Sequence, residues 1–202
     1  MTSPLSMPLW QNNPDTLLPA IVQDQNTGQV LMLGNMNEEA FMRMQKTGKV
    51  TFFSRSRQRL WEKGETSGNT LRFISASVDC DGDALLIRAI PVGPTCHTGD
   101  RSCFSAEETA PETIGNLAAT IRRRAETGSS VSYTKQLLTG GVAFYGAKVL
   151  EEAEEVVRAA KQEGKRRTIE EAADLLYHLL VLLEGEGISL DEIAGELRKR
   201  RR

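Results

Sequence analysis

The feature that most constrains the fold of this chain is a change of residue pattern near residue 105. Before this point, short apolar runs are separated by glycine, proline and polar residues, as in successive β-strands. After it, apolar residues recur at three- and four-residue spacing, which is typical of amphipathic helices. Strands followed by helices predict an α+β chain. We expect two domains, a β-rich domain over residues 1–106 and an all-α domain over residues 107–202.

Turn and capping residues divide the first half into elements. Residues 17–24 and 29–36 flank a QNTG turn and predict a hairpin. Residues 37–48 predict a short helix that begins after Asn37 and ends at Gly48. Further strands are expected over the ranges 49–56, 71–79 and 84–92.

The second half predicts helices over the ranges 113–126, 144–162, 168–186 and 189–200. Thr168 with Glu171, and Ser189 with Glu192, have the spacing of a capping box, in which the two side chains satisfy free N–H groups at a helix start. The basic run at 198–202 is interpreted as a helix end, where cations favour the helix dipole.

Charge and composition exclude several classes of protein. The formal net charge of −2 gives no reason to expect binding to nucleic acid. No run of 18 apolar residues predicts a membrane span, and the N-terminus lacks the basic and apolar segments of a secretory signal. We therefore expect a cytoplasmic protein. Its three cysteines, an odd number, argue against a disulfide framework.

The cysteines instead predict a metal site in the β-rich domain. Cys80, Cys96 and Cys103 lie close together in the sequence, and zinc (Zn²⁺) favours thiolate ligands. Three thiolates leave one position of a tetrahedral zinc ion open for water, as in catalytic sites. His97 is interpreted as a catalytic proton shuttle rather than a fourth ligand, because two adjacent residues rarely reach one ion.

The sequence DCDGD at residues 79–83 adds carboxylates beside one of these thiols. A calcium-binding EF-hand is excluded, because its sixth and twelfth positions hold Ala84 and Ile90 and its flanks are strand-like. A plain solvated turn remains open when the aspartates are taken alone. In an extended chain the carboxylates share one side and Cys80 lies on the other, unless Gly82 breaks the alternation. Carboxylates favour magnesium (Mg²⁺), so a magnesium site is predicted at Asp79, Asp81 and Asp83.

The segment 53–69 supplies cations, hydroxyls and glycines that suit a phosphate. It is not a P-loop, because the GxxxxGK[ST] pattern is absent. From the residues alone, a basic flexible loop is an equally good interpretation. The candidate substrate-binding residues are Arg55, Arg57, Lys63, Thr66 and Ser67.

Three segments in this order, SRSRQRLWEKGETSGN, DCDGDALL and GPTCHTGDRSCF, resemble the phosphoribosyl-AMP cyclohydrolase family of histidine biosynthesis over about residues 17–104. The resemblance implies hydrolytic opening of the adenine ring of phosphoribosyl-AMP at the N1–C6 bond. It also implies zinc on the three cysteines, at a site shared by the two subunits of a homodimer, and magnesium on the three aspartates.

A second acidic cluster lies in the helical half. Glu151 and Glu155 are four residues apart and Glu152 and Glu155 are three apart, which is mildly destabilising for like charges unless a cation lies between them. Glu171 and Asp174 share a face of the next helix. Two facing helices would offer these five carboxylates to magnesium. A solvated charged face is an equally good interpretation of the spacing alone.

The motifs EExxE and ExxD, with KV before them and LLYHLLVLL after, resemble the phosphoribosyl-ATP pyrophosphohydrolase family over about residues 113–200. The resemblance implies magnesium-dependent release of pyrophosphate from phosphoribosyl-ATP. Basic residues are common in this family before EExxE, where this chain has only Lys148. Because of this lack, phosphate contacts are expected from Lys135, Arg166 or Arg167. His178 is interpreted as a core residue.

These observations favour a bifunctional hydrolase that catalyses two consecutive steps of histidine biosynthesis. One alternative is a general nucleotide pyrophosphohydrolase with a structural zinc module. Another is a non-enzymatic protein that dimerises through zinc. Substrate choice and metal content distinguish the three.

Overall fold

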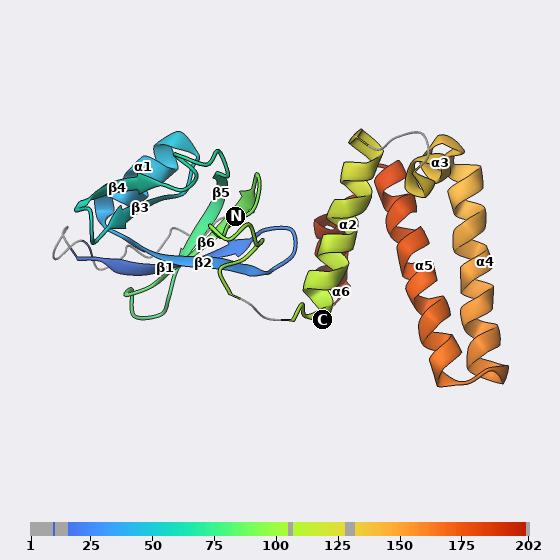
Figure 1. Cartoon of the computed structure of the whole chain (residues 1–202). Coiled ribbons are helices and arrows are strands. Elements are labelled where there is room, and N and C mark those ends of the chain that lie inside the picture. The colour runs from blue at the N-terminus through green and yellow to red at the C-terminus, as the bar shows by residue number, and fades with distance from the viewer. Residues whose placement is uncertain (1–9, 11–15, 105–106, 128–131, 201–202) are drawn as a thin grey trace. The chain divides into compact units, whose positions relative to one another are not determined.

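The computed structural model describes Trp10 and residues 16–104, 107–127 and 132–200 (Figure 1). The chain divides into two compact units, Met1–Glu112 and Thr113–Arg202. Strands fill the first unit and helices the second, as the sequence predicts. The boundary expected after residue 106 adjoins residues 105–106, which lie outside the described part of the chain.

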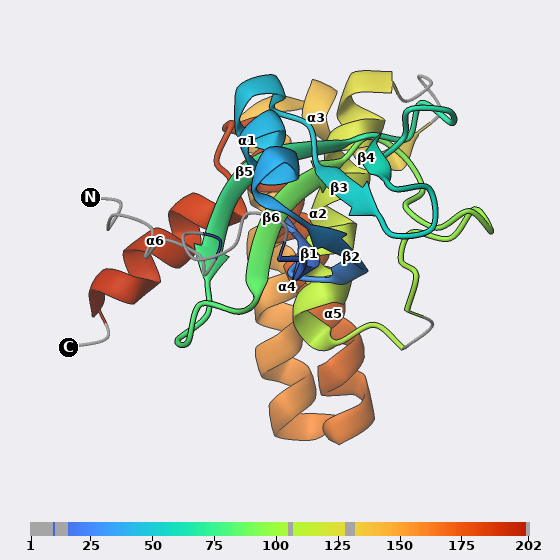
Figure 2. The same cartoon turned by 90° about the vertical axis from the view of Figure 1, so that its left-hand side faces the viewer.

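The first unit is built on a four-stranded sheet of order β2-β1-β6-β5 (Figure 2). β1 pairs antiparallel with β2 and parallel with β6, and β5 pairs antiparallel with β6. The hairpin and the two later strands expected from the sequence are confirmed. Their bounds are β1 Leu18–Asp24, β2 Val30–Met36, β5 Leu71–Val78 and β6 Leu85–Pro91.

Alternation along β1 shows how the sheet forms one side of the core. Leu18, Ala20 and Val22 are buried, whereas Pro19 and Ile21 between them are exposed. Successive side chains of a strand point to opposite faces, so one face of β1 packs inward. Its core partners include Leu31, Met36, Met44, Val50, Phe52, Leu71, Leu85 and Ile87.

Helix α1 (Glu38–Thr47) packs against this core through Ala40, Phe41 and Met44. The Asn37 side chain accepts a hydrogen bond from the backbone N–H of Ala40, and Gly48 ends the helix with a φ of 71°. Glycine suits this left-handed conformation because it has no Cβ. Both predicted helix boundaries are confirmed.

A two-stranded sheet follows, made of β3 (Thr51–Ser54) and β4 (Arg59–Glu62). The strand predicted over 49–56 is therefore shorter than expected. The interpretation of 53–69 as one flexible loop is wrong over residues 59–62, where β4 forms. The sequence hides β4 because only Leu60 and Trp61 in it are apolar. Trp61 pairs with Phe52 across the sheet, with ring centroids 5.6 Å apart, which ties β4 to the core.

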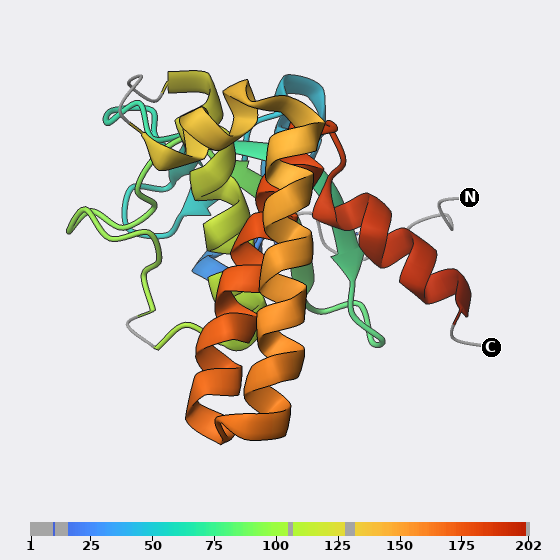
Figure 3. The ribbon, with the colours of Figure 1, turned by 90° about the vertical axis from the view of Figure 1, so that its right-hand side faces the viewer.

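Helices α4 and α5 of the second unit form an antiparallel hairpin (Figure 3). A small apolar core of Ile121, Leu137, Tyr145, Leu180 and Val181 holds the unit together. Within the described residues, no helix combines the length and the apolar character that a membrane crossing requires. The bounds are α2 Ala110–Thr127, α3 Tyr133–Thr139, α4 Gly141–Gln162, α5 Lys165–Gly185 and α6 Leu190–Arg200.

Two details of this unit differ from the sequence interpretation. Helix α3 was not predicted, because seven residues are too few to establish a helical period. The capping box at Thr168 and Glu171 is wrong: α5 begins after Gly164, and the Thr168 hydroxyl donates to the Gly164 carbonyl inside the helix. The capping box of Ser189 and Glu192 is confirmed by reciprocal hydrogen bonds of 2.8 and 3.3 Å.

Candidate active sites

A cavity of about 640 Å³ in the first unit gathers most of the residues that the sequence singles out there. Its wall combines the end of β3, the segment around β4 and the loop that carries two of the cysteines. Segments distant in sequence thus converge on one hollow. The predicted site residues in its lining are Arg57, Lys63, Thr66, Ser67, Cys96, His97 and Cys103.

One wall of the cavity is a tight loop over residues 63–69. Gly64 has a φ of 86°, and a Cβ placed there would lie 2.5 Å from the Asn69 carbonyl oxygen, so no larger residue fits. The buried Lys63 ammonium donates to the same carbonyl, at 3.3 Å. The loop presents the exposed Thr66 and Ser67 side chains. Lys63 therefore acts from inside the wall, whereas the hydroxyls meet solvent.

The opposite wall holds two cysteines on a turn. The backbone N–H of Cys96 donates to the Asp100 carbonyl at 3.0 Å, which closes the turn. The backbone N–H of Cys103 donates to the Leu31 carbonyl at 2.8 Å, and the Ser102 hydroxyl donates to the Val30 carbonyl at 2.7 Å. The thiol loop is thereby joined to strand β2.

A buried ion pair anchors the same loop to β1. Arg101 donates to the carboxylate of Asp24 at 2.6 Å, and the side chain of Asp24 is fully buried. The sequence motifs predict neither residue. One sign of the pair is visible in the sequence: Asp24 occupies an inward-facing position of the β1 alternation, where an apolar residue is the norm.

The two thiols of the cavity have opposite pKa shifts. Hydrogen bonds from the Thr98 hydroxyl and backbone N–H lower the pKa of Cys96. Burial and the neighbouring Cys96 raise the pKa of Cys103, against the opposing charge of Lys63. His97 lies beside them, with its Nδ1 3.7 Å from the Cys96 Sγ. Cys96 is therefore the thiol of the pair that loses its proton at the lower pH.

Two predicted members of this site lie elsewhere. Cys80 is exposed in the β5–β6 loop, where its thiol contacts the Asp81 carboxylate at 3.9 Å. Among the described residues, no group of three potential metal ligands includes a cysteine. Arg55 lines an adjoining hollow of about 350 Å³, which shares Ser54, Ser56 and Trp61 with the cavity. The described part of one chain therefore brings together Cys96 and Cys103 but leaves Cys80 apart.

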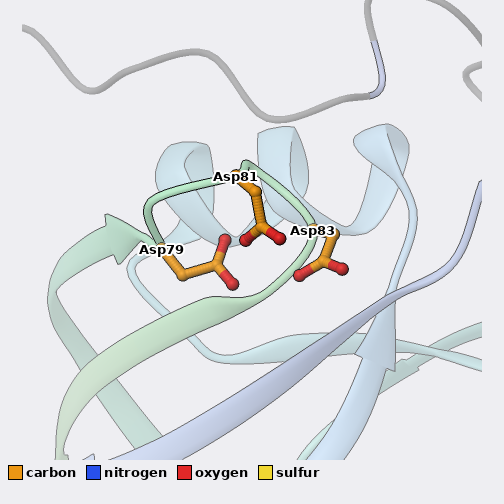
Figure 4. Close-up of side chains that lie close together, drawn as sticks. All are labelled: Asp79, Asp81 and Asp83. Atoms are coloured by element: carbon orange, nitrogen blue, oxygen red, sulfur yellow. The ribbon is translucent and has the colours of Figure 1, made fainter.

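The three aspartates converge in the β5–β6 loop (Figure 4). One oxygen from each of Asp79, Asp81 and Asp83 lies within 4.8 Å of the others. They meet because the chain turns: strand β5 ends at Val78, and Asp79 accepts hydrogen bonds from two backbone N–H groups of the loop. The extended alternation is therefore broken, as the sequence allows at Gly82, which has a φ of 85°, and the three carboxylates converge through the turn instead.

Their pKa values reflect this crowding. A backbone hydrogen bond from Ala84 is the main cause that lowers the pKa of Asp79. The hydrogen bond with Asp79 and the charges of Asp79 and Asp81 raise the pKa of Asp83. A bound divalent cation would relieve this repulsion, so the donor set fits magnesium.

A second carboxylate cluster lies between α4 and α5. Glu152 and Glu155 on α4 and Glu171 on α5 each place an oxygen within 4.8 Å of the others. Glu152 and Glu171 are buried, and burial is the main cause that raises the pKa of each. Buried carboxylates held this close have oxygen ligands of the kind that hard cations prefer.

The other two predicted carboxylates are less central. Glu151 is exposed and pairs with Lys148 at 2.8 Å, and Asp174 is exposed, although its charge raises the pKa of Glu152. Arg167, expected to bind phosphate, contacts Glu171 and partly neutralises the cluster. Arg166 pairs with Glu170 at 3.1 Å.

His178 is buried, as the sequence predicts for a core residue, and burial lowers its pKa. It also faces the cluster: its Nε2 lies 3.7 Å from the Oε1 of Glu152. The sequence analysis did not anticipate this second feature.

A strand-rich unit with a thiol- and imidazole-lined cavity, followed by a helical unit with clustered carboxylates, defines a two-domain hydrolase. Residues 32–105 match the family model for phosphoribosyl-AMP cyclohydrolase, and residues 114–201 match that for phosphoribosyl-ATP pyrophosphohydrolase. The chain belongs to the family of bifunctional histidine biosynthesis enzymes, in which the cyclohydrolase domain precedes the pyrophosphohydrolase domain. The resemblance seen in the sequence is confirmed.

Proteins similar to this chain, each named histidine biosynthesis bifunctional protein HisIE, occur in species of Staphylococcus and Vibrio. The protein of Staphylococcus aureus (strain COL) is 50% identical over 184 residues, which cover 91% of this chain and 87% of that protein. That of Vibrio vulnificus (strain CMCP6) is 46% identical over 189 residues, covering 92% and 90%. That of Vibrio parahaemolyticus is 45% identical over the same length.

Proposed function

We propose that the cavity of the first unit binds phosphoribosyl-AMP and opens its adenine ring at the N1–C6 bond. The observation that carries this proposal is the meeting of Cys96, Cys103 and His97 with Lys63 and the 63–69 loop in one hollow. Thiols and an imidazole suit hydrolysis of the base, and the ammonium and hydroxyls suit the phosphate. Arg57, which also lines the cavity, adds a second cation.

Cys96 and Cys103 fit zinc, because one thiol has a lowered pKa and the other interacts with it directly. When bound, zinc supplies hydroxide near neutral pH by lowering the pKa of a water. His97 takes the proton of the attacking water on Nε2, because its Nδ1 faces the Cys96 sulfur. The 63–69 loop holds the phosphate end, so the ring lies toward the thiols.

Cys80 and the three aspartates are proposed to reach this site from a second copy of the chain. Cys80 lies apart from the other two thiols within the described part of one chain, so a homodimer is needed to bring three sulfurs to one zinc. Asp79, Asp81 and Asp83 would hold magnesium in the same loop. The three free cysteines favour a reducing compartment, and we place the protein in the cytoplasm.

Mixing two inactive variants tests the shared site. Cys80→Ser and Cys103→Ser homodimers each lack a complete thiol set, so neither is expected to open the ring. Exchange of subunits restores one intact site per mixed dimer, which predicts about a quarter of the normal ring-opening rate. Pyrophosphate release should stay unchanged in every sample. No recovery after demonstrated subunit exchange would refute the shared site.

The second unit is proposed to hydrolyse phosphoribosyl-ATP to phosphoribosyl-AMP and pyrophosphate, with magnesium on Glu152, Glu155 and Glu171. When bound, magnesium neutralises phosphate charge and activates water. Glu151 and Asp174, at the edge of the cluster, complete the set expected from the sequence. The product is then the substrate of the first unit.

Feeding phosphoribosyl-ATP and measuring pyrophosphate and the ring-opened product separately tests this order. Glu152→Gln is expected to abolish pyrophosphate release while leaving ring opening of added phosphoribosyl-AMP intact. Hydrolysis of ordinary deoxynucleoside triphosphates at the same rate as phosphoribosyl-ATP would contradict the proposed substrate.

A further inference from the structure

His178 is a buried residue of α5 that lies beside the carboxylate cluster. The residue is 5% exposed, and its Nε2 points to the Oε1 of Glu152 at 3.7 Å. His178 follows Glu171 by seven residues, which is two helical turns, so both side chains lie on the same face of α5. The imidazole therefore borders the cluster from inside the unit.

Aromatic neighbours fix the plane of the imidazole. The ring of Tyr177 meets it at 78° with centroids 5.1 Å apart, and the ring of Tyr133 meets it at 85° and 6.1 Å. The Tyr177 hydroxyl is itself held by Thr134 at 2.9 Å. Edge contacts with these two stacked tyrosine rings limit the freedom of the imidazole to turn away from Glu152.

The other ring nitrogen shows that packing alone does not explain a histidine here. Nδ1 is buried, and no hydrogen-bond partner for it occurs among the described residues. An unpaired buried polar group is destabilising, and leucine at the same place would avoid that cost. The imidazole must therefore contribute through its other nitrogen, which faces the carboxylate.

Glu152 is the member of the cluster that most needs such a partner. Glu155 contacts Arg158 at 3.4 Å, and Glu171 contacts Arg167. For Glu152, the ion-pair contact within 4 Å among the described residues is with His178. The charge of Lys148 also acts on Glu152, but Lys148 makes its own contact with Glu151 at 2.8 Å. His178 is therefore the side chain best placed to direct the Glu152 carboxylate toward the other two.

We propose that His178 is a positioning residue of the pyrophosphohydrolase site, whose Nε2–H faces the Glu152 carboxylate at 3.7 Å and directs it toward Glu155 and Glu171. The inference rests on the proposed role of the three carboxylates as metal ligands. Outer partners of this kind orient ligating groups, and their loss typically weakens metal affinity 10- to 100-fold. The proton must reside on Nε2, which leaves Nδ1 as the unpaired acceptor.

Two amide side chains that differ by one methylene group separate positioning from packing. In His178→Gln the amide nitrogen reaches about as far as Nε2, whereas in His178→Asn it reaches only about as far as Nδ1. His178→Leu removes the donor and keeps an apolar side chain. The three variants are made in the full chain carrying Asp79→Asn, Asp81→Asn and Asp83→Asn, so that added Mn²⁺ reports on the helical cluster. Mn²⁺ affinity is measured by electron paramagnetic resonance.

We expect the Asn and Leu variants to bind Mn²⁺ about 10- to 100-fold more weakly than the parent, and the Gln variant to stay within a few-fold of it. The same pattern is expected in the Mg²⁺ concentration that supports half-maximal pyrophosphate release. Ring opening of phosphoribosyl-AMP, measured without the aspartate substitutions, should not change.

Each contrary result has a distinct meaning. If the parent with histidine does not bind Mn²⁺, the proposed metal role of the cluster fails and the positioning role fails with it. If the parent binds and all three variants bind equally well, only the positioning role is overturned. It is also overturned if Gln and Asn lose affinity equally, in proportion to a fall in the thermal unfolding midpoint, because His178 then only packs.

Discussion

Removing the guanidinium of Arg101 is expected to destabilise the first unit, because it leaves a buried charge without its partner. Asp24 has no exposed side-chain surface, and its Oδ2 accepts from Arg101 at 2.6 Å. Its Oδ1 keeps a backbone N–H from Asn26 at 2.8 Å. Arg101→Met keeps an unbranched apolar stem and deletes every donor, so it mainly reports the loss of the pair.

The magnitude follows from the unequal exposure of the two partners. Breaking a fully buried pair costs about 3–5 kcal/mol, whereas an exposed pair contributes at most about 1 kcal/mol. The Asp24 side chain is 0% exposed and the Arg101 side chain is 41% exposed. Water can approach the carboxylate once the guanidinium is gone, so we expect the free energy of unfolding to fall by about 2 kcal/mol.

Tryptophan fluorescence during urea unfolding measures this change in the first unit alone. The chain has two tryptophans, and both Trp10 and Trp61 belong to that unit. The helical signal in circular dichroism is expected to change little. Arg43→Gln, which alters an exposed arginine on α1, is the matched control and should have no effect beyond about 0.5 kcal/mol.

A double-mutant cycle with Asp24→Asn completes the test. The two substitutions should be strongly non-additive, since either one removes the same pair. The interpretation of a buried, anchoring ion pair is refuted if Arg101→Met costs no more than Arg43→Gln, or if the two changes at the pair simply add.

Three further results are expected. Gly34→Ala places a Cβ 2.3 Å from the Phe52 ring and should cost about 1–3 kcal/mol in the same tryptophan assay. Asp83 has a raised pKa, so its ionised form opposes folding at neutral pH and the penalty disappears in acid, where the carboxyl is protonated in both states. Asp83→Asn should therefore raise the thermal unfolding midpoint of the metal-free chain at pH 7. This stabilisation should disappear below the ordinary pKa of aspartate. It should also disappear when Mg²⁺ is added and binds beside Asp79. Ser189→Ala should destabilise α6 by about 1 kcal/mol, seen as faster amide exchange in its first turn.

Short-range features of the fold could be predicted because their causes lie within a few residues. The caps at Asn37, Gly48 and Ser189 depend on side chains that contact backbone one turn away. The same spacing misled at Thr168, because a threonine and a glutamate three residues apart also occur inside a helix. The point where the helix begins decides between the two cases: α5 begins after Gly164, so Thr168 already lies inside it.

The candidate sites show the same division. Motif order identified the residues of the cavity, since their chemistry is specific. It did not reveal that Cys80 lies apart from Cys96, because neighbours in a motif need not be neighbours in space. Nor did it reveal Asp24 and Arg101, whose separation in sequence hides a direct contact. Long-range geometry, rather than residue type, is what the sequence pattern lacks.

The parallel pairing of β1 with β6 sets the order in which the first unit assembles during synthesis. Ala20 lies beside Leu85, so the centre of the sheet stays incomplete until the ribosome has made β6. β2 pairs with β1 much earlier, which leaves the other edge of β1 open in the meantime. Open edges invite association with other chains, and distant pairings form slowly. We therefore expect the nascent first unit to need chaperones more than the α4–α5 hairpin, whose partners emerge one after the other.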